Sequence, residues 1–352
     1  MNLDEYLKLA KPIDEISIEG AKEHWSTVAK PLNSLGILEE AVVRIAGIER
    51  KINIDISRKA LIIMCADNGV VEEGVTQSPS EVTAIVTENF AKGDTSVCKM
   101  ARVANATIFP IDIGVARDLT EAGVINKKIA YGTYNMTKGS AMTAEQAENA
   151  IIVGIEMVRD LKEQGYNLFA TGEMGIGNTT TSSAIASVLL DMEVEAVTGR
   201  GAGLSSVGLT KKINAIKKAI EVNKPNKDNG LDVLAKLGGF DIAGMAGVFI
   251  GGAIYQVPVL VDGIISSVAA LVAMKICPIA KKYMIASHVS KEPAGQAVMK
   301  MLELKPFLTC EMCLGEGTGA VAAMPILDMA ASVYNEMSTF NEIKVEQYVP
   351  LN

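Results

Sequence analysis

Two glutamates stand in glycine-rich segments, a setting that suits chemistry at a bound ligand. Glu173 lies in residues 172–183 (GEMGIGNTTTSS) and Glu316 in residues 314–320 (LGEGTGA), each ahead of a helix-like pattern. Glycine neighbours let the backbone approach a ligand closely, and a carboxylate placed there can remove a proton from a reacting group. A carboxylate at a helix start can also serve only to complement the helix dipole. We expect both glutamates to face one cleft as catalytic groups.

The segment around Glu173 also predicts a phosphate site. Glycines let backbone N–H groups converge on an anion, hydroxyls add donors, and a helix N-terminus supplies partial positive charge. The glycine spacing fits neither a GxGxxG fingerprint nor a P-loop, since no Gly-Lys-Ser/Thr follows. A tight turn before a capped helix is the alternative. The predicted anion-binding residues are Gly175, Ile176, Gly177, Asn178, Thr179 and Thr180. Beside two carboxylates, such a site suits proton removal next to a phosphorylated sugar.

One lysine is a candidate for the same cleft. Residues 209–220 show an amphipathic helical pattern with leucine and isoleucine on the apolar face. At 100° per residue, Lys212 falls at the boundary, roughly 80° from the centre of that face. A lysine there can bury its stem and turn its ammonium group into a cleft, although a solvated lysine is the more usual outcome.

Short apolar runs predict the elements that must position these groups. The runs are residues 60–65, 107–112, 168–171, 257–261 and 283–286, with helix-like patterns between them. Strands that alternate with helices form right-handed βαβ units and a parallel sheet. The predicted fold class is therefore an α/β protein with a doubly wound, mostly parallel, Rossmann-like sheet. Ligands bind beyond the carboxyl ends of such strands, so we expect one cleft to be shared by the turns at residues 66–69, 113–115, 172–178, 262–263 and 287–290.

Composition narrows the classes of partner. The chain has 352 residues and a formal charge of −8, and an acidic surface repels nucleic acid and anionic lipid, so we expect neither as a partner. The longest uncharged stretch, residues 242–261, has the length of a membrane span. Its glycines and Pro258 favour instead a buried helix, a turn and a buried strand. With no signal-peptide pattern at the start of the sequence and five scattered cysteines, we expect a cytoplasmic protein with reduced thiols.

The sequence contains one CxxC pair, Cys310 and Cys313. A zinc site would need two further ligands, and the only two histidines, His24 and His288, are not near another cysteine in the sequence. We interpret the pair as two thiols at the end of an element, and we expect no metal and no cofactor.

An ordered set of segments runs through most of the chain, and it is more specific than any single motif. The segments are 66–70 (ADNGV), 81–84 (EVTA), 172–180 (GEMGIGNTT), 199–204 (GRGAGL) with Lys212, 258–263 (PVLVDG), 287–288 (SH), 292–293 (EP) and 315–320 (GEGTGA). Through them the chain resembles the nicotinate-nucleotide–dimethylbenzimidazole phosphoribosyltransferase family of cobamide lower-ligand assembly. The resemblance implies transfer of the ribosyl phosphate of nicotinate mononucleotide to an aromatic acceptor, giving an α-riboside phosphate and nicotinate.

The resemblance also implies an architecture and residue roles. It implies a large α/β domain at residues 56–324, a small helical domain from residues 1–55 and 325–352, and a dimer, either of identical chains or with a paralogous chain. Glu316 falls on the catalytic base and Glu173 on a second carboxylate near the acceptor. The phosphate loop gains Lys212, Gly201 and Gly203, and the acceptor pocket takes Ser78, Ser80, Ile85, Met174, Leu314 and Gly315.

The chain departs from the family pattern at a few positions. Asn68 stands where members usually have histidine, Ser78 where an aromatic residue is common, and Ile85 where a glutamine is common. Since these positions line the acceptor pocket in the family, 5,6-dimethylbenzimidazole and phenol or p-cresol are equal alternatives as acceptor. A hypothesis of another class is a non-catalytic nucleotide-binding subunit that supports a paralogous catalytic chain. The intact Glu316 and Glu173 argue against it.

Overall fold

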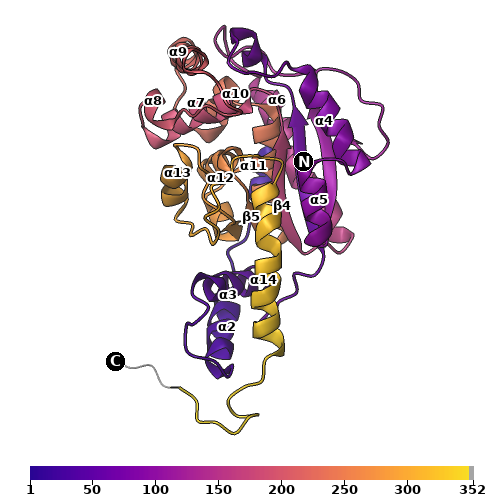
Figure 1. Cartoon of the computed structure of the whole chain (residues 1–352), viewed down its shortest axis with the longest axis vertical. Helices are drawn as coiled ribbons and strands as arrows, with labels where there is room; N and C mark the ends of the chain where they lie inside the picture. The colour runs from indigo at the N-terminus through magenta and orange to yellow at the C-terminus, as the bar shows by residue number, and fades with distance from the viewer. Residues whose placement is uncertain (349–352) are drawn as a thin grey trace.

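A six-stranded sheet forms the centre of the larger part of the molecule (Figure 1), in a computed structural model that describes residues 1–348. All neighbouring strands are parallel, in the order β3-β2-β1-β4-β5-β6. The strands are β1 (Lys59–Ala66), β2 (Ala106–Gly114), β3 (Ile125–Asn126), β4 (Leu168–Met174), β5 (Val259–Val261) and β6 (Met284–Ala286). The sheet is doubly wound, which confirms the predicted fold class. Its switch point lies between β1 and β4, where sheets of this kind bind ligands.

The five predicted strands are present, with two differences. β3 was not predicted, because two residues carry no periodicity. β4 runs on to Met174, so that Gly172 and Glu173 pair with Ile63 and Met64 of β1. Our placement of Gly172 and Glu173 in a turn was therefore wrong. Glycine and glutamate are weak strand formers, and pairing with β1 overrides that preference.

Helices cover both faces of the sheet, which is why the strands read as apolar runs. All eight residues of β1 are buried, and successive residues enter two different cores. The first core includes α1 (Leu3–Leu7), α6 (Ala144–Glu163), α7 (Asn178–Leu190), α8 (Val194–Val197), α9 (Ser206–Asn223), α10 (Gly230–Leu237), α11 (Phe240–Tyr255), α12 (Ile264–Ile276), η2 (Pro278–Tyr283) and α13 (Gly295–Leu302). The second includes α2 (Glu15–Thr27), α3 (Ile37–Glu49), α4 (Glu81–Lys92), α5 (Ser96–Val103) and α14 (Thr318–Glu336). A short 3₁₀ helix, η1 (Gly69–Glu73), follows β1.

The uncharged stretch forms a buried helix, a turn and a strand, as predicted. α11 is buried over fifteen of its sixteen residues, and β5 follows after Pro258. Glycines let α11 lie directly on α6, because a Cβ on Gly247 would stand 3.0 Å from the Cα of Gly154. Among the helices of residues 1–348, none combines the length and the apolar character that crossing a membrane requires.

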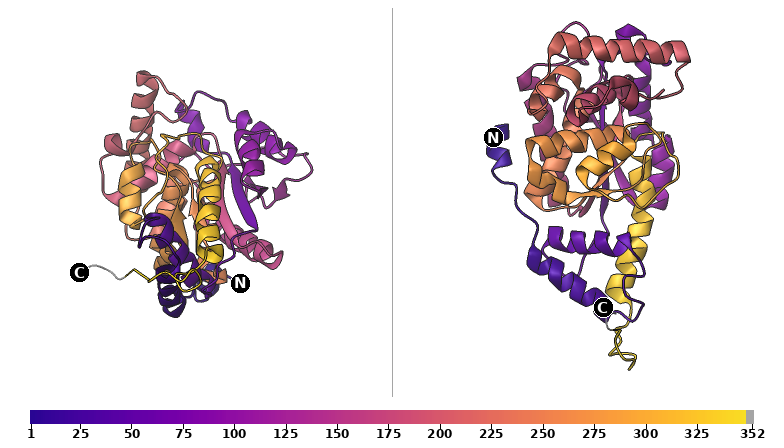
Figure 2. Two further views of the ribbon diagram at one scale, coloured as in Figure 1. Left: turned by 60° about the horizontal axis from the view of Figure 1, so that its bottom comes forward. Right: turned by 90° about the vertical axis from the view of Figure 1, so that its left-hand side faces the viewer.

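The two chain ends meet away from the sheet. Figure 2 shows α2 and α3 beside the lower half of α14, where Trp25 packs edge-on against Tyr334 and Val28 bridges Thr339. This packing supports the small helical domain of residues 1–55 and 325–352, which remains a proposal; residues 349–352 lie outside the described part. Two observations concern the boundaries of this proposed domain. α1, which belongs to residues 1–55, packs against α6 and α11 of the larger part. α14 continues without a break across residue 325.

Candidate active site

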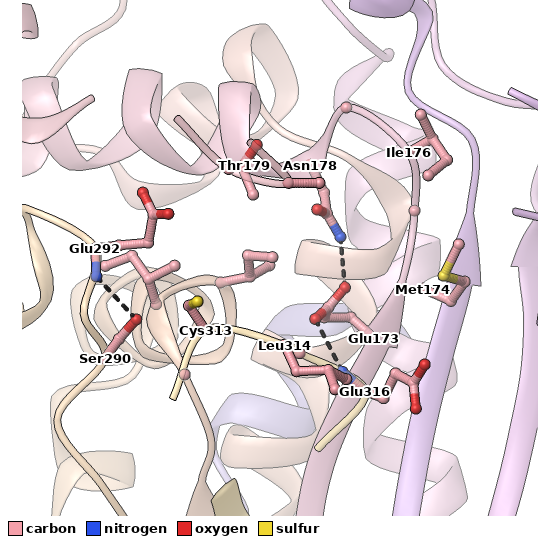
Figure 3. Close-up of a pocket in the computed structure, with 18 of the residues that line it drawn as sticks. Glu173, Met174, Ile176, Asn178, Thr179, Ser290, Glu292, Cys313, Leu314 and Glu316 are labelled. Carbon is pink, nitrogen blue, oxygen red and sulfur yellow. Dashed lines mark hydrogen bonds between the residues drawn. The ribbon is translucent and has the colours of Figure 1, made fainter. Parts of the chain in front are cut away.

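A cavity of about 240 Å³ opens at the carboxyl ends of β4, β5 and β6 (Figure 3). Three of the five predicted turns line it, those at residues 172–178, 262–263 and 287–290, whereas the turns after β1 and β2 do not. The turn after β1 lies behind the wall, since a Cβ on Gly175 would stand 2.5 Å from the carbonyl oxygen of Ala66. The expectation of one cleft shared by all five turns was therefore wrong for the first two.

The predicted phosphate loop forms one wall of the cavity. Gly175, Ile176, Gly177, Asn178 and Thr179 line it, and α7 begins at Asn178 with no side chain capping its N-terminus. Gly177 has φ +97°, a conformation that favours glycine. The N–H groups of Asn178 and Thr180 donate to the carbonyl oxygens of Gly175 and Gly177, whereas those of Gly177 and Thr179 have no partner within the described residues and are available to an anion. Thr180 does not line the cavity; it is fully buried, and its Oγ1 has no hydrogen-bond partner within the described residues.

Lys212 is buried below this loop rather than solvated. Its side chain is only 1% exposed. Its Nζ donates to Thr179 Oγ1 at 2.9 Å and to the carbonyl oxygen of Gly199 at 3.2 Å. Burial lowers the pKa of Lys212 to about 8, and Glu292 partly opposes this shift. A buried ammonium group that touches the phosphate loop is suited to bind an anion there.

The two other predicted phosphate residues lie in the loop that covers Lys212. Gly201 lines the cavity, and a Cβ on it would stand 2.9 Å from Thr179 Oγ1. Gly203 lies outside the lining, and its carbonyl oxygen accepts a hydrogen bond from the Gln77 side chain. The loop of residues 199–204 is thereby joined to the segment that carries Ser78.

Glu316 lines the cavity from a backbone of unusual shape. Gly315, Glu316 and Gly317 all have positive φ, at +91°, +62° and +88°. A non-glycine residue in this region costs about 1–3 kcal/mol, and such costs cluster at functional sites. Glu316 Oε2 accepts from the backbone N–H of Val97 at the start of α5, at 3.1 Å. Burial raises the pKa of Glu316 above its ordinary value, as suits a group that takes up a proton.

Glu173 lies beside Glu316 and Asn178 (Figure 3). Its Oε1 accepts from the backbone N–H of Glu316 at 3.3 Å, and its Oε2 accepts from Asn178 Nδ2 at 2.7 Å. Glu173 is 7% exposed, and burial raises its pKa well above the ordinary value. The structure therefore brings the two predicted carboxylates and the phosphate loop into one cavity.

The predicted acceptor-pocket residues divide into two groups. Ser78, Met174, Leu314 and Gly315 line the cavity. Two others do not line it. Ser80 Oγ donates to Asp67 Oδ1 at 2.9 Å, and Ile85 is 51% exposed on the surface of α4.

Several lining residues were missing from the predicted site. Five polar or charged ones among them are Arg200, Asp262, His288, Ser290 and Glu292. Four of these lie in or beside turns that the sheet argument had placed at the cleft, so the position of a polar residue after a buried strand was the available signal. Arg200 lies in a loop between helices, which offers no such signal.

Carboxyl groups dominate the charge inside and behind this cavity. Burial raises the pKa of Glu173, Glu316, Asp262 and Asp241 above their ordinary values. Asp262 Oδ1 accepts from the backbone N–H of Ala320, near the start of α14. Over the described residues, no group of three or more His, Cys, Asp or Glu side chains is arranged to hold a metal ion. Cys310 and Cys313 are free and exposed, and Cys313 lines the cavity.

Comparison with known proteins relates this arrangement to a family. A family model described as phosphoribosyltransferase matches residues 10–345. The nicotinate-nucleotide–dimethylbenzimidazole phosphoribosyltransferases of Ruminiclostridium cellulolyticum and Clostridium acetobutylicum are each 49% identical over 351 residues, covering 100% of both chains. The chain belongs to this phosphoribosyltransferase family. A crystal structure of the corresponding phosphoribosyltransferase from Thermus thermophilus superposes with a TM-score of 0.89 at 35% identity, covering 96% of this chain and 100% of that one.

Membership of the phosphoribosyltransferase family identifies the chain as an enzyme that transfers a pentosyl group. The cavity brings together the carboxyl groups of Glu173 and Glu316 and the glycine-rich loop of residues 175–179. The similarity extends over the whole chain, so both the sheet and the helical chain ends belong to the family fold.

Proposed function

We propose that this enzyme transfers the ribosyl phosphate of nicotinate mononucleotide to 5,6-dimethylbenzimidazole, releasing nicotinate and giving an α-riboside 5′-phosphate for cobamide synthesis. The names of relatives that match the whole chain support these substrates. The observation that carries the proposal is the pairing of Glu316 with the phosphate loop across one cavity. An acceptor that lies between them meets a base on one side and the ribosyl phosphate on the other.

We assign a task to each group of the site. The phosphate binds at residues 175–179, where the N–H groups of Gly177 and Thr179 have no partner within the described residues, and Lys212, which lies behind Thr179 and does not line the cavity, adds positive charge. Nicotinate leaves from a pyridinium whose ring nitrogen becomes neutral, and the anomeric carbon gains positive charge in the transition state. The carboxylate of Glu173 stabilises that charge. Glu316 takes the proton that the acceptor nitrogen loses.

The departures from the family pattern bear on which acceptor the enzyme uses. Of the departures that suggested phenol or p-cresol, Ile85 lies outside the cavity lining, whereas Ser78 lines the cavity. Only the departure at Ser78 changes the cavity surface, and the names of the relatives support a benzimidazole. Product formation from phenol or p-cresol, but not from dimethylbenzimidazole, would refute this choice.

We also propose that the enzyme acts as a dimer of identical chains. Apolar side chains that protrude from α4, α5 and α14 support an interface on that face: Ile85, Val103 and Met329. Sedimentation equilibrium of the purified chain should give twice the monomer mass. A monomer mass at micromolar concentration would refute the proposal.

The variant Glu316→Gln tests the proposed function. Glutamine preserves the shape and one acceptor oxygen but cannot take up the proton. We expect kcat to fall by about 10²–10⁴, with little change in KM for nicotinate mononucleotide, measured by chromatography of nicotinate and the riboside phosphate. Glu311→Gln is the matched control, because Glu311 is an exposed glutamate of the same segment with positive φ. Turnover of Glu316→Gln at the wild-type rate would contradict the assignment. An inactive wild-type homodimer would favour the non-catalytic subunit.

A further inference from the structure

A second buried carboxyl group, Asp241, lies behind the phosphate loop. It stands in the first turn of α11, has no exposed surface and does not line the cavity. Asn178 connects it with the active site, because Asn178 Nδ2 donates to Asp241 Oδ2 at 3.0 Å and to Glu173 Oε2 at 2.7 Å. Two buried carboxyl groups therefore share the donor of one amide.

The side chain of Asn68 faces Asp241 from the turn after β1. Asn68 Nδ2 and Asp241 Oδ2 lie together under Gly175, at 3.0 and 2.6 Å from the position that a Cβ on this glycine would take. Asn68 Oδ1 and Asp241 Oδ1 lie on the other side, where a Cβ on Gly239 would collide with both atoms. Asn68 Nδ2 also donates to the carbonyl oxygen of Ala66, at 3.5 Å.

This arrangement leaves one acceptor without a donor. Asn68 Oδ1 is buried and has no hydrogen-bond partner within residues 1–348. An unsatisfied buried oxygen is costly, and an ionised Asp241 offers only further acceptors. Asp241 Oδ1 accepts from the backbone N–H of Ile242 at 3.0 Å, and a proton on this oxygen would in addition supply the donor that Asn68 Oδ1 lacks. Amide and acid then form two hydrogen bonds, from Asn68 Nδ2–H to Oδ2 and from Asp241 Oδ1–H to Asn68 Oδ1.

We propose that Asp241 is a positioning residue that works as a neutral acid locked to Asn68, so that no negative charge lies behind the loop that receives the phosphate. The effect on phosphate binding rests on the proposed function, whereas the protonation of Asp241 does not. Burial raises the pKa of Asp241 to about 7, so that the group carries its proton below that pH.

Burial alone raises the pKa of Asp241, and hydrogen bonds from Asn178, from the backbone N–H of Ile242 and from Asn68 lower it. The titratable groups around Asp241 are Glu173 on β4, Asp262 after β5 and Cys65 on β1. Asp112 at the end of β2 is neutralised by Lys128 at 2.9 Å. The buried residues of α6 and α12, which pack on α11, are all uncharged. In the described part of the chain, the buried ion pairs do not include Asp241 or Glu173.

A neutral Asp241 matters because of where it lies. Its Oδ2 is directly below Gly175 in the loop that receives the phosphate. A negative charge at that point opposes a phosphate group and, across the Asn178 bridge, disfavours ionisation of Glu173. The two bridged oxygens are separated by no more than the sum of 2.7 and 3.0 Å. At this separation, one full charge raises the pKa of the other group by roughly two units at an effective dielectric constant near 20.

The first test measures stability and needs no turnover. Asp241→Asn imitates the neutral acid, since its amide can donate to Asn68 and accept from Asn178. In the wild type, Asp241 has a higher pKa in the folded protein (about 7) than in the unfolded chain (near 3.8). Its contribution to the free energy of unfolding is therefore lost as the pH rises from near 3.8 to about 7. Asp241→Asn has no carboxyl group at this position and does not lose that contribution. The Tm of Asp241→Asn relative to wild type should therefore rise by ~3 °C or more between pH 4.5 and pH 7 and then level off. A difference independent of pH would overturn the proposal.

The second test measures activity and includes a matched control. At pH 6, Asp241→Asn should keep kcat/KM within about threefold of wild type. Above pH 7 its KM for nicotinate mononucleotide should rise less than that of the wild type. A loss of tenfold or more at pH 6 in a folded variant would show that the ionised form is needed. Asp112→Asn, which removes a buried carboxylate from an ion pair, should lower Tm without reproducing either pH effect.

A measurement that does not require Asp241→Asn to fold completes the design. In protein labelled with ¹³C at the aspartate carboxyl carbon, Asp262→Asn removes the other buried aspartate whose pKa burial raises. One aspartate carbon should still titrate near pH 7 in that variant. Absence of such a titration would overturn the proposal. Absence of turnover with a normal titration would instead contradict the proposed function alone.

Discussion

Replacing Lys212 by methionine separates the phosphate interaction from the rest of the site. The ammonium group is 1% exposed and is held by Thr179 Oγ1 and the carbonyl oxygen of Gly199. Its pKa falls from 10.5 to about 8, which corresponds to a burial cost on the order of 3 kcal/mol for the charged form. This cost is already present before any ligand binds. The attraction for an incoming phosphate, about 4 kcal/mol per unit charge at 4 Å and an effective dielectric constant of 20, is therefore not reduced by further desolvation of the lysine.

We expect Lys212→Met to weaken nicotinate mononucleotide binding by about 3 kcal/mol, or ~150-fold, after allowing for desolvation of the phosphate. Calorimetric titration between pH 7 and 9.5 measures it. Wild-type affinity should fall as pH rises through about 8, because the ammonium group then loses its proton, whereas the variant should not change in this range. Lys211→Met is the control, since Lys211 is the exposed neighbour on α9. Equal affinities for the wild type and Lys212→Met, with the same pH dependence, would refute the phosphate role.

Lys212→Met should also change how the stability of the protein depends on pH, in a direction that follows from the lowered pKa of Lys212. A lysine whose folded pKa is lowered destabilises the folded state while it is charged, and this loss is recovered as pH rises from about 8 to 10.5. Lys212→Met should therefore be at least as stable as wild type at pH 7. Its advantage should shrink over that higher range, as followed by thermal unfolding. A less stable variant at pH 7 would mean that the methionine packs poorly in this space.

Two further predictions concern the segment that carries the base. The methyl group of Gly315→Ala would stand 2.5 Å from Glu173 Oε1, on a backbone with φ +91°. We expect kcat to fall at least tenfold, with about 1–3 kcal/mol of added strain. Gly139→Ala is the control and should leave kinetics and Tm unchanged, because its methyl group would meet nothing within 4 Å among the described residues. Iodoacetamide should inactivate the enzyme through Cys313, which is exposed and lines the cavity, and nicotinate mononucleotide should protect it. Cys313→Ser should resist the reagent and Cys310→Ser should not; the opposite pattern would contradict the placement of these thiols.

The fold was predictable because burial on both faces gives the strands their continuous apolar runs. β1 shows the principle, since its residues from Ala60 to Ala66 enter the two cores alternately and a polar residue among them would be costly. β3 was missed because its two residues pair with β2 without a pattern of their own. The end of β4 was missed because Gly172 and Glu173 are held by pairing with β1, a contact over more than one hundred residues of sequence.

The site was predictable only where its residues follow strands or glycines. Periodicity placed Lys212 at the edge of a helix face, but its burial depends on the loop of residues 199–204, which no local pattern reports. Ile85 was assigned by resemblance alone, and the structure places its side chain in solvent on α4. The link from Glu173 through Asn178 to Asp241 spans 63 residues between the last two, so no spacing rule could reveal it.

The course of α14 limits how this enzyme can be recombined with its relatives. The helix begins beside the loop that carries Glu316, and its far end packs on α3. Its 19 residues span about 28 Å at 1.5 Å per residue. A chimaera joined at residue 325 would splice two sequences inside this rod, and any mismatch in helical phase would turn the base loop relative to the sheet. Exchange points belong before residue 318 or after residue 336, where a change of direction in the chain absorbs the difference.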